Sequence, residues 1–135
     1  MKHLRTILWG NPAENNHDCC SLFQIQNGFQ LQGMAILLAN NLPMRVAYRI
    51  ACTSEWKTQL VELDVWKGNS QQLFMLRVDE QQRWWLDDTE LSQFRGLIDV
   101  DLGFTPATNT LPIRRMQRND ENSNIVTAVW VQFPS

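Results

Sequence analysis

Two carboxylates and two arginines in the C-terminal third of the chain are the residues best placed to do chemistry. Asp99 and Asp101 alternate with apolar residues, so in a β-strand both carboxylates lie on one face of the sheet. A segment rich in Thr, Asn and Pro follows, and Arg114 and Arg115 come directly after it. A long, polar, turn-rich segment in a small domain commonly carries function. If the aspartates line a cavity, they can pair with either arginine and anchor a hydroxyl-rich group of a ligand.

The same residues allow other interpretations. The aspartates can lie on a solvated outer face, since acidic residues are seldom buried without a partner. Paired carboxylates can also indicate glycoside hydrolysis, but neighbours on one strand face are too close together for an inverting mechanism. Arg114, Arg115 and Arg118 can form a solvated turn, or a phosphate or carboxylate site suited to the planar fork of arginine.

Elsewhere the chain offers little support for catalysis or metal binding. His17, Asp18, Cys19 and Cys20 are of metal-ligand types, but their spacing matches no standard zinc pattern and no second cluster accompanies them. Cys52 ends an apolar alternation, which favours an inert core thiol over a nucleophile. We therefore expect a protein that is not an enzyme and that has no catalytic residue, metal or cofactor.

Charge and composition limit the possible partners. The 135 residues carry a net charge of −2, so they exert no general attraction on nucleic acid or on anionic membranes. No basic-aromatic platform and no phosphate-binding glycine loop occurs, and we expect no nucleic-acid partner. Six tryptophans and six phenylalanines accompany one tyrosine, and these aromatic residues either fill a core or line an apolar ligand cavity.

Targeting signals are weak in this sequence. Met1 to Arg5 is charged, and the apolar run Thr6–Trp9 is too short for a signal peptide. The longest apolar run, Met34–Ala39, is far shorter than a membrane span. Three cysteines make an odd number, which fits a reducing compartment. The expectation is a cytoplasmic protein with no integral membrane segment.

Alternating apolar residues separated by turn residues predict an all-β protein. The expected strands cover residues 2–9, 21–26, 29–38, 45–52, 61–65, 73–78, 83–86, 98–102 and 125–133. Regular strands with tight turns indicate an antiparallel sheet that is strongly curved, as a half-barrel or barrel-like form. Two short helical turns are expected, one over residues 90–94 capped by Asp88-Thr89 and one over residues 112–116, with a polar loop over 117–124.

The Asn27-Gly28 pair predicts a β-hairpin. The apolar pattern favours a three-residue loop, Gln26 to Gly28, with Gly28 in the left-handed conformation. That loop would pair Ile25 with Phe29, and thus keep the apolar side chains of both strands on one face of the sheet.

The segment DLGFTPATNTLPIRR, residues 101–115, resembles the signature of the putative glycolipid-binding proteins, a bacterial family of small β-rich proteins. Weaker similarities occur in the same order along nearly the whole chain. They are residues 14–17, Gly33, residues 46–52, residues 55–58 and residues 129–134. The resemblance implies a curved sheet that encloses a cavity, similar to that of bacterial lipoprotein carriers.

The resemblance also implies a function and a site. The function is the binding of an amphipathic ligand, such as a glycolipid, in an apolar cavity, with the segment from Phe104 to Arg115 as a loop at the cavity mouth. The expected ligand-binding residues are Asp99, Asp101, Phe104, Thr105, Asn109, Thr110, Arg114, Arg115 and Trp56. The alternative is a self-associating structural module with a packed interior and no ligand.

The end of the chain carries a further expectation. Family members continue with more strands beyond the Phe133-Pro134 pair, so residues 1–135 are expected to be a single domain that corresponds to the N-terminal part of the family's domain. The last expected strand is apolar on both faces, and such a strand recruits other chains when its edge or face is left open. A homo-oligomer formed through this strand is therefore a possible assembly.

Overall fold

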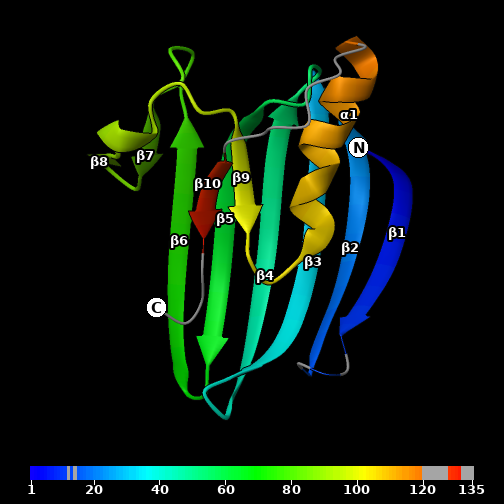
Figure 1. Cartoon of the computed structure of the whole chain (residues 1–135), viewed down its shortest axis with the longest axis vertical. Coiled ribbons are helices and arrows are strands. Elements are labelled where there is room, and N and C mark those ends of the chain that lie inside the picture. Colours follow the sequence, from blue (N-terminus) through cyan, green and yellow to red (C-terminus); the bar gives the residue numbers. More distant parts are fainter. Residues whose placement is uncertain (12, 14, 120–127, 132–135) are drawn as a thin grey trace.

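Eight antiparallel strands form one continuous sheet in which every strand pairs with its neighbour in sequence. The computed structural model describes residues 1–11, 13, 15–119 and 128–131. The strands are β1 (Lys2–Asn11), β2 (Asn16–Ile25), β3 (Gly28–Ala39), β4 (Leu42–Thr53), β5 (Thr58–Lys67), β6 (Ser70–Val78), β7 (Trp84–Leu86) and β8 (Thr89–Glu90). Their order in the sheet is the order of the sequence, and β1 and β8 form its two open edges (Figure 1).

A second layer covers one face of this sheet, which we call the inner face. It consists of β9 (Asp99–Leu102), the 3-10 helix η3 (Pro106–Asn109), the helix α1 (Thr110–Asn119) and β10 (Ala128–Val131). A short 3-10 turn, η2 (Ser92–Phe94), precedes this layer. In Figure 1, α1 lies in front of the N-terminal half of the sheet and the β9–β10 pair lies in front of the C-terminal half.

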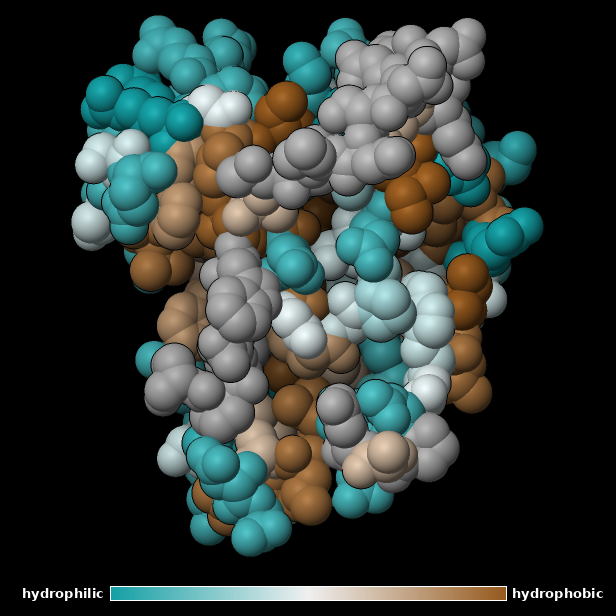
Figure 2. All heavy atoms as spheres, in the orientation of Figure 1, coloured by the Kyte–Doolittle hydropathy of each residue, from teal (hydrophilic) through white to brown (hydrophobic). Residues whose placement is uncertain are grey.

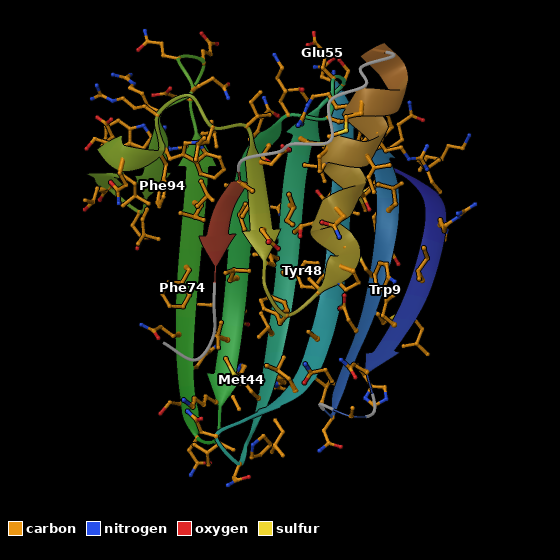
Figure 3. The ribbon with its side chains drawn as sticks, viewed as in Figure 1. Trp9, Met44, Tyr48, Glu55, Phe74 and Phe94 are labelled. Atoms are coloured by element: carbon orange, nitrogen blue, oxygen red, sulfur yellow. The ribbon has the colours of Figure 1, made fainter. Side chains whose placement is uncertain are left out.

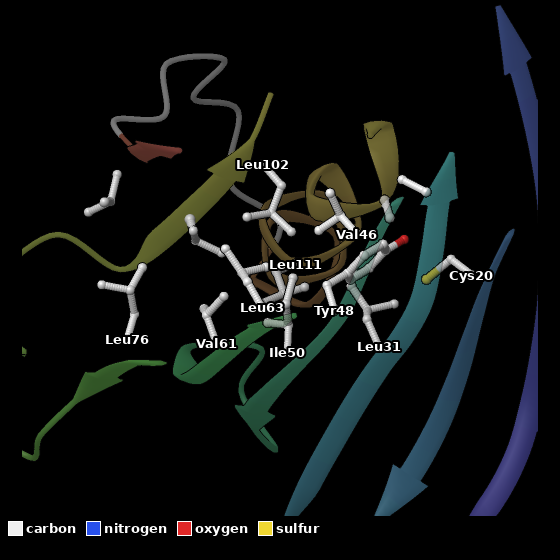
Figure 4. Packing of buried hydrophobic residues seen from close by; sticks show 14 of the residues in the cluster. Cys20, Leu31, Val46, Tyr48, Ile50, Val61, Leu63, Leu76, Leu102 and Leu111 are labelled. Atoms are coloured by element: carbon white, nitrogen blue, oxygen red, sulfur yellow. The ribbon is translucent and has the colours of Figure 1, made fainter. Parts of the chain in front are cut away.

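The core lies between these two layers because every second side chain of a strand points to the inner face, and those side chains are mostly apolar. Val46, Tyr48 and Ile50 of β4 are buried, whereas the residues between them are less buried. They pack in one cluster with Leu102 and Leu111 from the covering layer (Figure 4). Figure 4 also shows the strands curving around this cluster, with α1 on the concave side. Burial of apolar surface between the layers is the main contribution to the stability of such a fold.

The opposite, outer face of the sheet carries apolar side chains that no described element covers. Met34, Ile36, Leu38, Leu73 and Met75 are all exposed large hydrophobic residues, and they occupy the outward positions of β3 and β6. Rows of exposed apolar residues on a sheet are unusual for a monomer and often mark contact surfaces.

The prediction of a strongly curved antiparallel sheet with little helix is confirmed. The described residues contain one short α-helix, α1, and the sheet is not closed. One strand pair departs from the antiparallel prediction, because β10 runs parallel to β9. Among the described residues no helix has the length and apolar character needed to span a membrane. Most of residues 117–124, and part of the expected last strand, lie outside the described residues.

The predicted three-residue hairpin loop is wrong. Ile25 pairs with Gly28, so the turn contains only Gln26 and Asn27, and Asn27 is the residue with a positive φ of 64°. Gly28 instead lies in β3, where an added Cβ would sit 2.0 Å from the carbonyl oxygen of Cys52. The glycine is therefore required by the close approach of β4 and not by the turn.

Two expectations about the helical segments also need correction. The expected loop from Phe104 to Arg115 is largely helical, since η3 runs directly into α1. Thr105 supplies the cap of η3, because its side-chain oxygen accepts a hydrogen bond from the amide of Ala107. The helical turn expected over residues 90–94 begins later, at Ser92, because Thr89–Glu90 pairs with β7 as a strand.

Candidate functional site

Two adjoining hollows lie on the inner face between the N-terminal strands and the covering layer. The first, which we call the acidic hollow, has a volume of about 470 Å³. Its lining residues are Trp9, Gly10, Asn11, Asn16, His17, Asp18, Asp101, Leu102, Gly103, Phe104, Thr105 and Pro106. Two carboxylates and two asparagines thus face a space that also has aromatic walls.

The second hollow, which we call the apolar hollow, has a volume of about 310 Å³ and runs between β1–β3 and α1. Its lining residues are Arg5, Ile7, Trp9, Cys20, Leu22, Leu31, Pro106, Asn109, Thr110, Ile113 and Arg114. Hydrophobic atoms gather in Figure 2 along the β1 edge of this face. Aliphatic side chains from strands and helix therefore make most of the apolar wall.

Trp9 and Pro106 line both hollows, so the two spaces meet at these residues. Figure 3 shows Trp9 on β1, facing the start of the helical segment. The combined groove is mainly apolar at one end and acidic at the other. Such a division suits a molecule with a hydrocarbon part and a polar part.

Asp18 is the most deeply buried charged residue of the acidic hollow, with 3% of its surface exposed. Its Oδ2 accepts a hydrogen bond of 2.7 Å from the Tyr48 hydroxyl and a second one from the Thr105 hydroxyl. Its Oδ1 has no hydrogen-bond partner among the described residues. Burial raises the pKa of Asp18 above its ordinary value, although the hydrogen bonds from Thr105 and Tyr48 partly oppose that shift.

The Asp18 contacts join three parts of the fold. Asp18 lies on β2, Tyr48 on β4, and Thr105 at the start of η3. Gly33 on the intervening strand β3 makes this arrangement possible, because a Cβ there would lie 2.4 Å from the Tyr48 hydroxyl oxygen. The network therefore fixes the covering layer against the sheet at the acidic hollow.

Asp99 and Arg115 form a buried ion pair outside both hollows. The guanidinium of Arg115 donates two hydrogen bonds, of 2.8 Å to Oδ1 and 2.5 Å to Oδ2 of Asp99. Only 3% of the Asp99 side chain and 14% of the Arg115 side chain are exposed. Arg115 also donates a hydrogen bond of 3.1 Å to the carbonyl oxygen of Trp56. This geometry anchors α1 to β9 and to the turn between β4 and β5.

Trp56 is a packed residue that lines neither of the two hollows. Its ring stacks on Phe29 with 3.8 Å between the centroids and an interplanar angle of 8°, and only 7% of its surface is exposed. The guanidinium of Arg114 lies over the same ring, 5.7 Å from its centroid. Together with Arg115, these contacts hold the helix in place.

The structure divides the nine residues expected to bind ligand into two groups. Asp101, Phe104 and Thr105 line the acidic hollow, whereas Asn109, Thr110 and Arg114 line the apolar hollow. Asp99, Arg115 and Trp56 make the anchoring contacts described above and line neither hollow. A role of any of these residues in ligand binding stays a prediction.

Sequence reasoning missed Asp18 and Trp9 as members of the site. Asp18 shares its strand face with Cys20 and Leu22, and a carboxylate in an apolar alternation is a signal that could have marked it. Trp9 carried no such signal, because its position beside η3 depends on contacts between residues far apart in the sequence.

No metal centre stands out in the described part of the chain, and two of the three thiols are buried. No group of three His, Cys, Asp or Glu side chains is placed to hold a metal ion among those residues. Cys20 and Cys52 are buried, which raises the pKa of the first thiol to about 11 and that of the second to about 12. Cys19 is the exposed cysteine.

The family model described as Putative glycolipid-binding matches residues 6–135, nearly the whole chain. The chain belongs to the putative glycolipid-binding family. No curated protein matches it significantly.

A solved structure has the same fold as this member of the putative glycolipid-binding family. The structure is that of a DUF1089 family protein from Pseudomonas aeruginosa, with 21% sequence identity and a TM-score of 0.74. The similarity covers 97% of the present chain and 70% of the Pseudomonas chain. It supports the architecture of the sheet and its covering layer.

Proposed function

We propose that this chain binds an amphipathic molecule, such as a glycolipid, in the groove on its inner face and does not transform it chemically. The observation that carries this proposal is the meeting of the acidic and apolar hollows at Trp9 and Pro106. The family's description points in the same direction. Transfer of a hydrocarbon chain from water into the apolar hollow is favourable, and the polar groups of the ligand can form hydrogen bonds with residues of the acidic hollow.

A fluorescent lipid and two matched variants test this proposal. Ile113 lines the apolar hollow and is 51% exposed, whereas Ile36 is 60% exposed on the outer face. Each is replaced by Asp, and binding of a neutral glycosyl-diacylglycerol with a fluorescent acyl chain is measured by titration. We expect Ile113→Asp to weaken binding by about tenfold or more, because the charge must be desolvated beside the chain. Ile36→Asp should bind like the parent.

Native mass spectrometry of freshly purified protein provides an independent measurement. A co-purified lipid that is present in the parent and lost in Ile113→Asp supports the proposal. Equal binding of the fluorescent lipid by the parent and by Ile113→Asp would contradict it, since the groove would then not be the binding site.

The second candidate is a self-associating module, and the uncovered apolar residues of the outer face favour it. In that case Ile36→Asp should abolish the assembly, whereas Ile113→Asp should not. Light scattering across a concentration series measures this difference. Association through the last strand stays a prediction: β10 pairs along one edge with β9, and the residues after Val131 lie outside the described part.

A further inference from the structure

Asp18 has one carboxyl oxygen, Oδ1, that accepts no hydrogen bond from the described residues. Oδ2 already accepts hydrogen bonds from Tyr48 and Thr105, and these contacts hold the carboxyl group in one orientation. Oδ1 is buried and has no partner among the described residues, although Asp18 lines the acidic hollow. A buried acceptor without a donor is unfavourable, so a ligand that brings an O–H or N–H group to this oxygen gains affinity.

The charges around the hollow limit which ligand group can approach. Asp18 and Asp101 both line it, and its described lining contains neither lysine nor arginine. The two arginines of the groove, Arg5 and Arg114, line the apolar hollow instead, and His17 is the histidine in the lining of the acidic hollow. A phosphate or carboxylate head would therefore meet two carboxylates in the acidic hollow, whereas uncharged hydroxyl groups would meet acceptors.

The walls of the acidic hollow suit a ring-shaped group. Trp9 and Phe104 contribute aromatic surface, and Asn11 contributes an amide that can both donate and accept hydrogen bonds. Aromatic faces with a few convergent polar groups are typical of sites that orient a small molecule.

We infer that the acidic hollow recognises the uncharged, hydroxyl-rich head of the ligand, with Asp18 Oδ1 as a hydrogen-bond acceptor, while the hydrocarbon chain extends past Trp9 into the apolar hollow. The inference rests on the proposed function and adds to it the chemical class of the head and its direction in the groove. Asp18 acts here as a specificity-determining residue, because it favours a donor and repels an anion.

Two single-chain amphiphiles with the same tail test this inference. Octyl glucoside carries an uncharged head with several hydroxyl groups, and octyl phosphate carries an anionic head. Both are titrated into the protein by calorimetry below their micelle concentrations at neutral pH. We expect octyl glucoside to bind about tenfold more tightly, the effect of one hydrogen bond to a charged acceptor.

Asp18→Asn is the decisive variant. Its amide oxygen can keep the hydrogen bonds from Tyr48 and Thr105, which places an NH₂ group where Oδ1 was. The preference for octyl glucoside should fall about tenfold in this variant. Asp64→Asn is the matched control, since Asp64 lies on β5 and does not line the groove. It should keep the preference of the parent.

Asp101→Asn provides a second route if Asp18→Asn does not fold. Asp101 is only partly buried, and its replacement should strengthen the binding of octyl phosphate while leaving the fold intact. Tighter binding of octyl phosphate by the parent would overturn the inference and place the head beside Arg5 and Arg114. Equal affinities that no variant changes would also overturn it, although groove binding would stand. If neither amphiphile binds the parent, both proposals fail.

Discussion

The hydroxyl of Tyr48 donates a buried hydrogen bond of 2.7 Å to Asp18, a residue 30 positions earlier in the chain and two strands away in the sheet. The contact crosses β3 at Gly33, where the absence of a side chain leaves room for the phenol ring. Because Thr105 donates to the same carboxyl oxygen, the position of the covering layer depends on this crossing.

Replacing Gly33 with Ala should destabilise the fold. The added Cβ would lie 2.4 Å from the Tyr48 oxygen and 2.9 Å from the carbonyl oxygen of Cys19, and the second of these is backbone. Overpacking of this kind typically costs about 1–3 kcal/mol of unfolding free energy, which urea denaturation measures. Gly10→Ala is the control, because its nearest neighbour is a His17 side-chain atom at 3.1 Å. An equal loss in both variants would show that the approach of Tyr48 is not the cause.

Asp18 should make stability depend on pH. Its pKa in the folded protein is raised above the ordinary value of 3.8, chiefly by burial. The folded protein therefore keeps this proton where the unfolded chain has lost it, and stability falls as pH rises from about 3.8 through the folded pKa. Urea denaturation of the parent and of Asp18→Asn between about pH 4 and pH 7 checks this sign. The parent should lose stability relative to the variant as pH rises, and a constant difference would contradict the raised pKa.

The buried Asp99–Arg115 pair should contribute far more to stability than an exposed pair. Arg115→Ala leaves an almost fully buried carboxylate without its partner, a change that typically costs about 3–5 kcal/mol. The comparison is Arg95→Ala, which removes the partner of Glu90 in a pair whose arginine side chain is 60% exposed. That variant should keep a urea midpoint close to that of the parent, because exposed ion pairs contribute little to stability. Similar urea midpoints for the two variants would mean that Arg115 does not anchor α1.

The three thiols should differ in reactivity. Cys19 is exposed, whereas burial raises the pKa of Cys20 to about 11 and that of Cys52 to about 12. Since the thiolate is the reactive form, Ellman's reagent should titrate one thiol in the native protein and all three in denaturant. The fast thiol should disappear in Cys19→Ser. Rapid labelling of more than one thiol would indicate that the sheet opens around Cys20 or Cys52.

The regular strands could be predicted from the sequence because the alternation of β4 and β5 reports directly which side chains are buried. The helical nature of residues 106–119 was harder to foresee. A helical turn was expected only over residues 112–116, which lie within α1. Pro106 indicated a turn, yet proline is also tolerated in the first turn of a helix, as in η3. The predicted hairpin register was wrong because Gly28 is required by the close approach of Cys52 on β4. This is a tertiary contact that the local sequence pattern does not indicate.

The candidate site was predictable only in part. The segment from Asp101 to Arg114 does border the groove, and its residue types pointed there. The opposite wall comes from β1 and β2, and the pairing of Asp18 with Thr105 spans 87 positions. Local reasoning has no access to such a contact, nor to the geometry of the ion pair between Asp99 and Arg115. Their expected role in ligand binding stays a prediction.

The strictly sequential strand order has a consequence for how the chain reaches its native state. Each hairpin of the sheet closes over a short stretch of chain, so the sheet can grow by adding one neighbour at a time. The contact between Asp18 and Thr105 instead closes a very long loop, because the two residues are 87 positions apart. The conformational entropy of that loop is therefore lost late in folding. We expect the covering layer to form last and open first, so amide protons of α1 should exchange with solvent faster than those of β3 and β4. A groove whose cover opens before its sheet gives an amphipathic molecule a way in while the strands of the sheet stay paired.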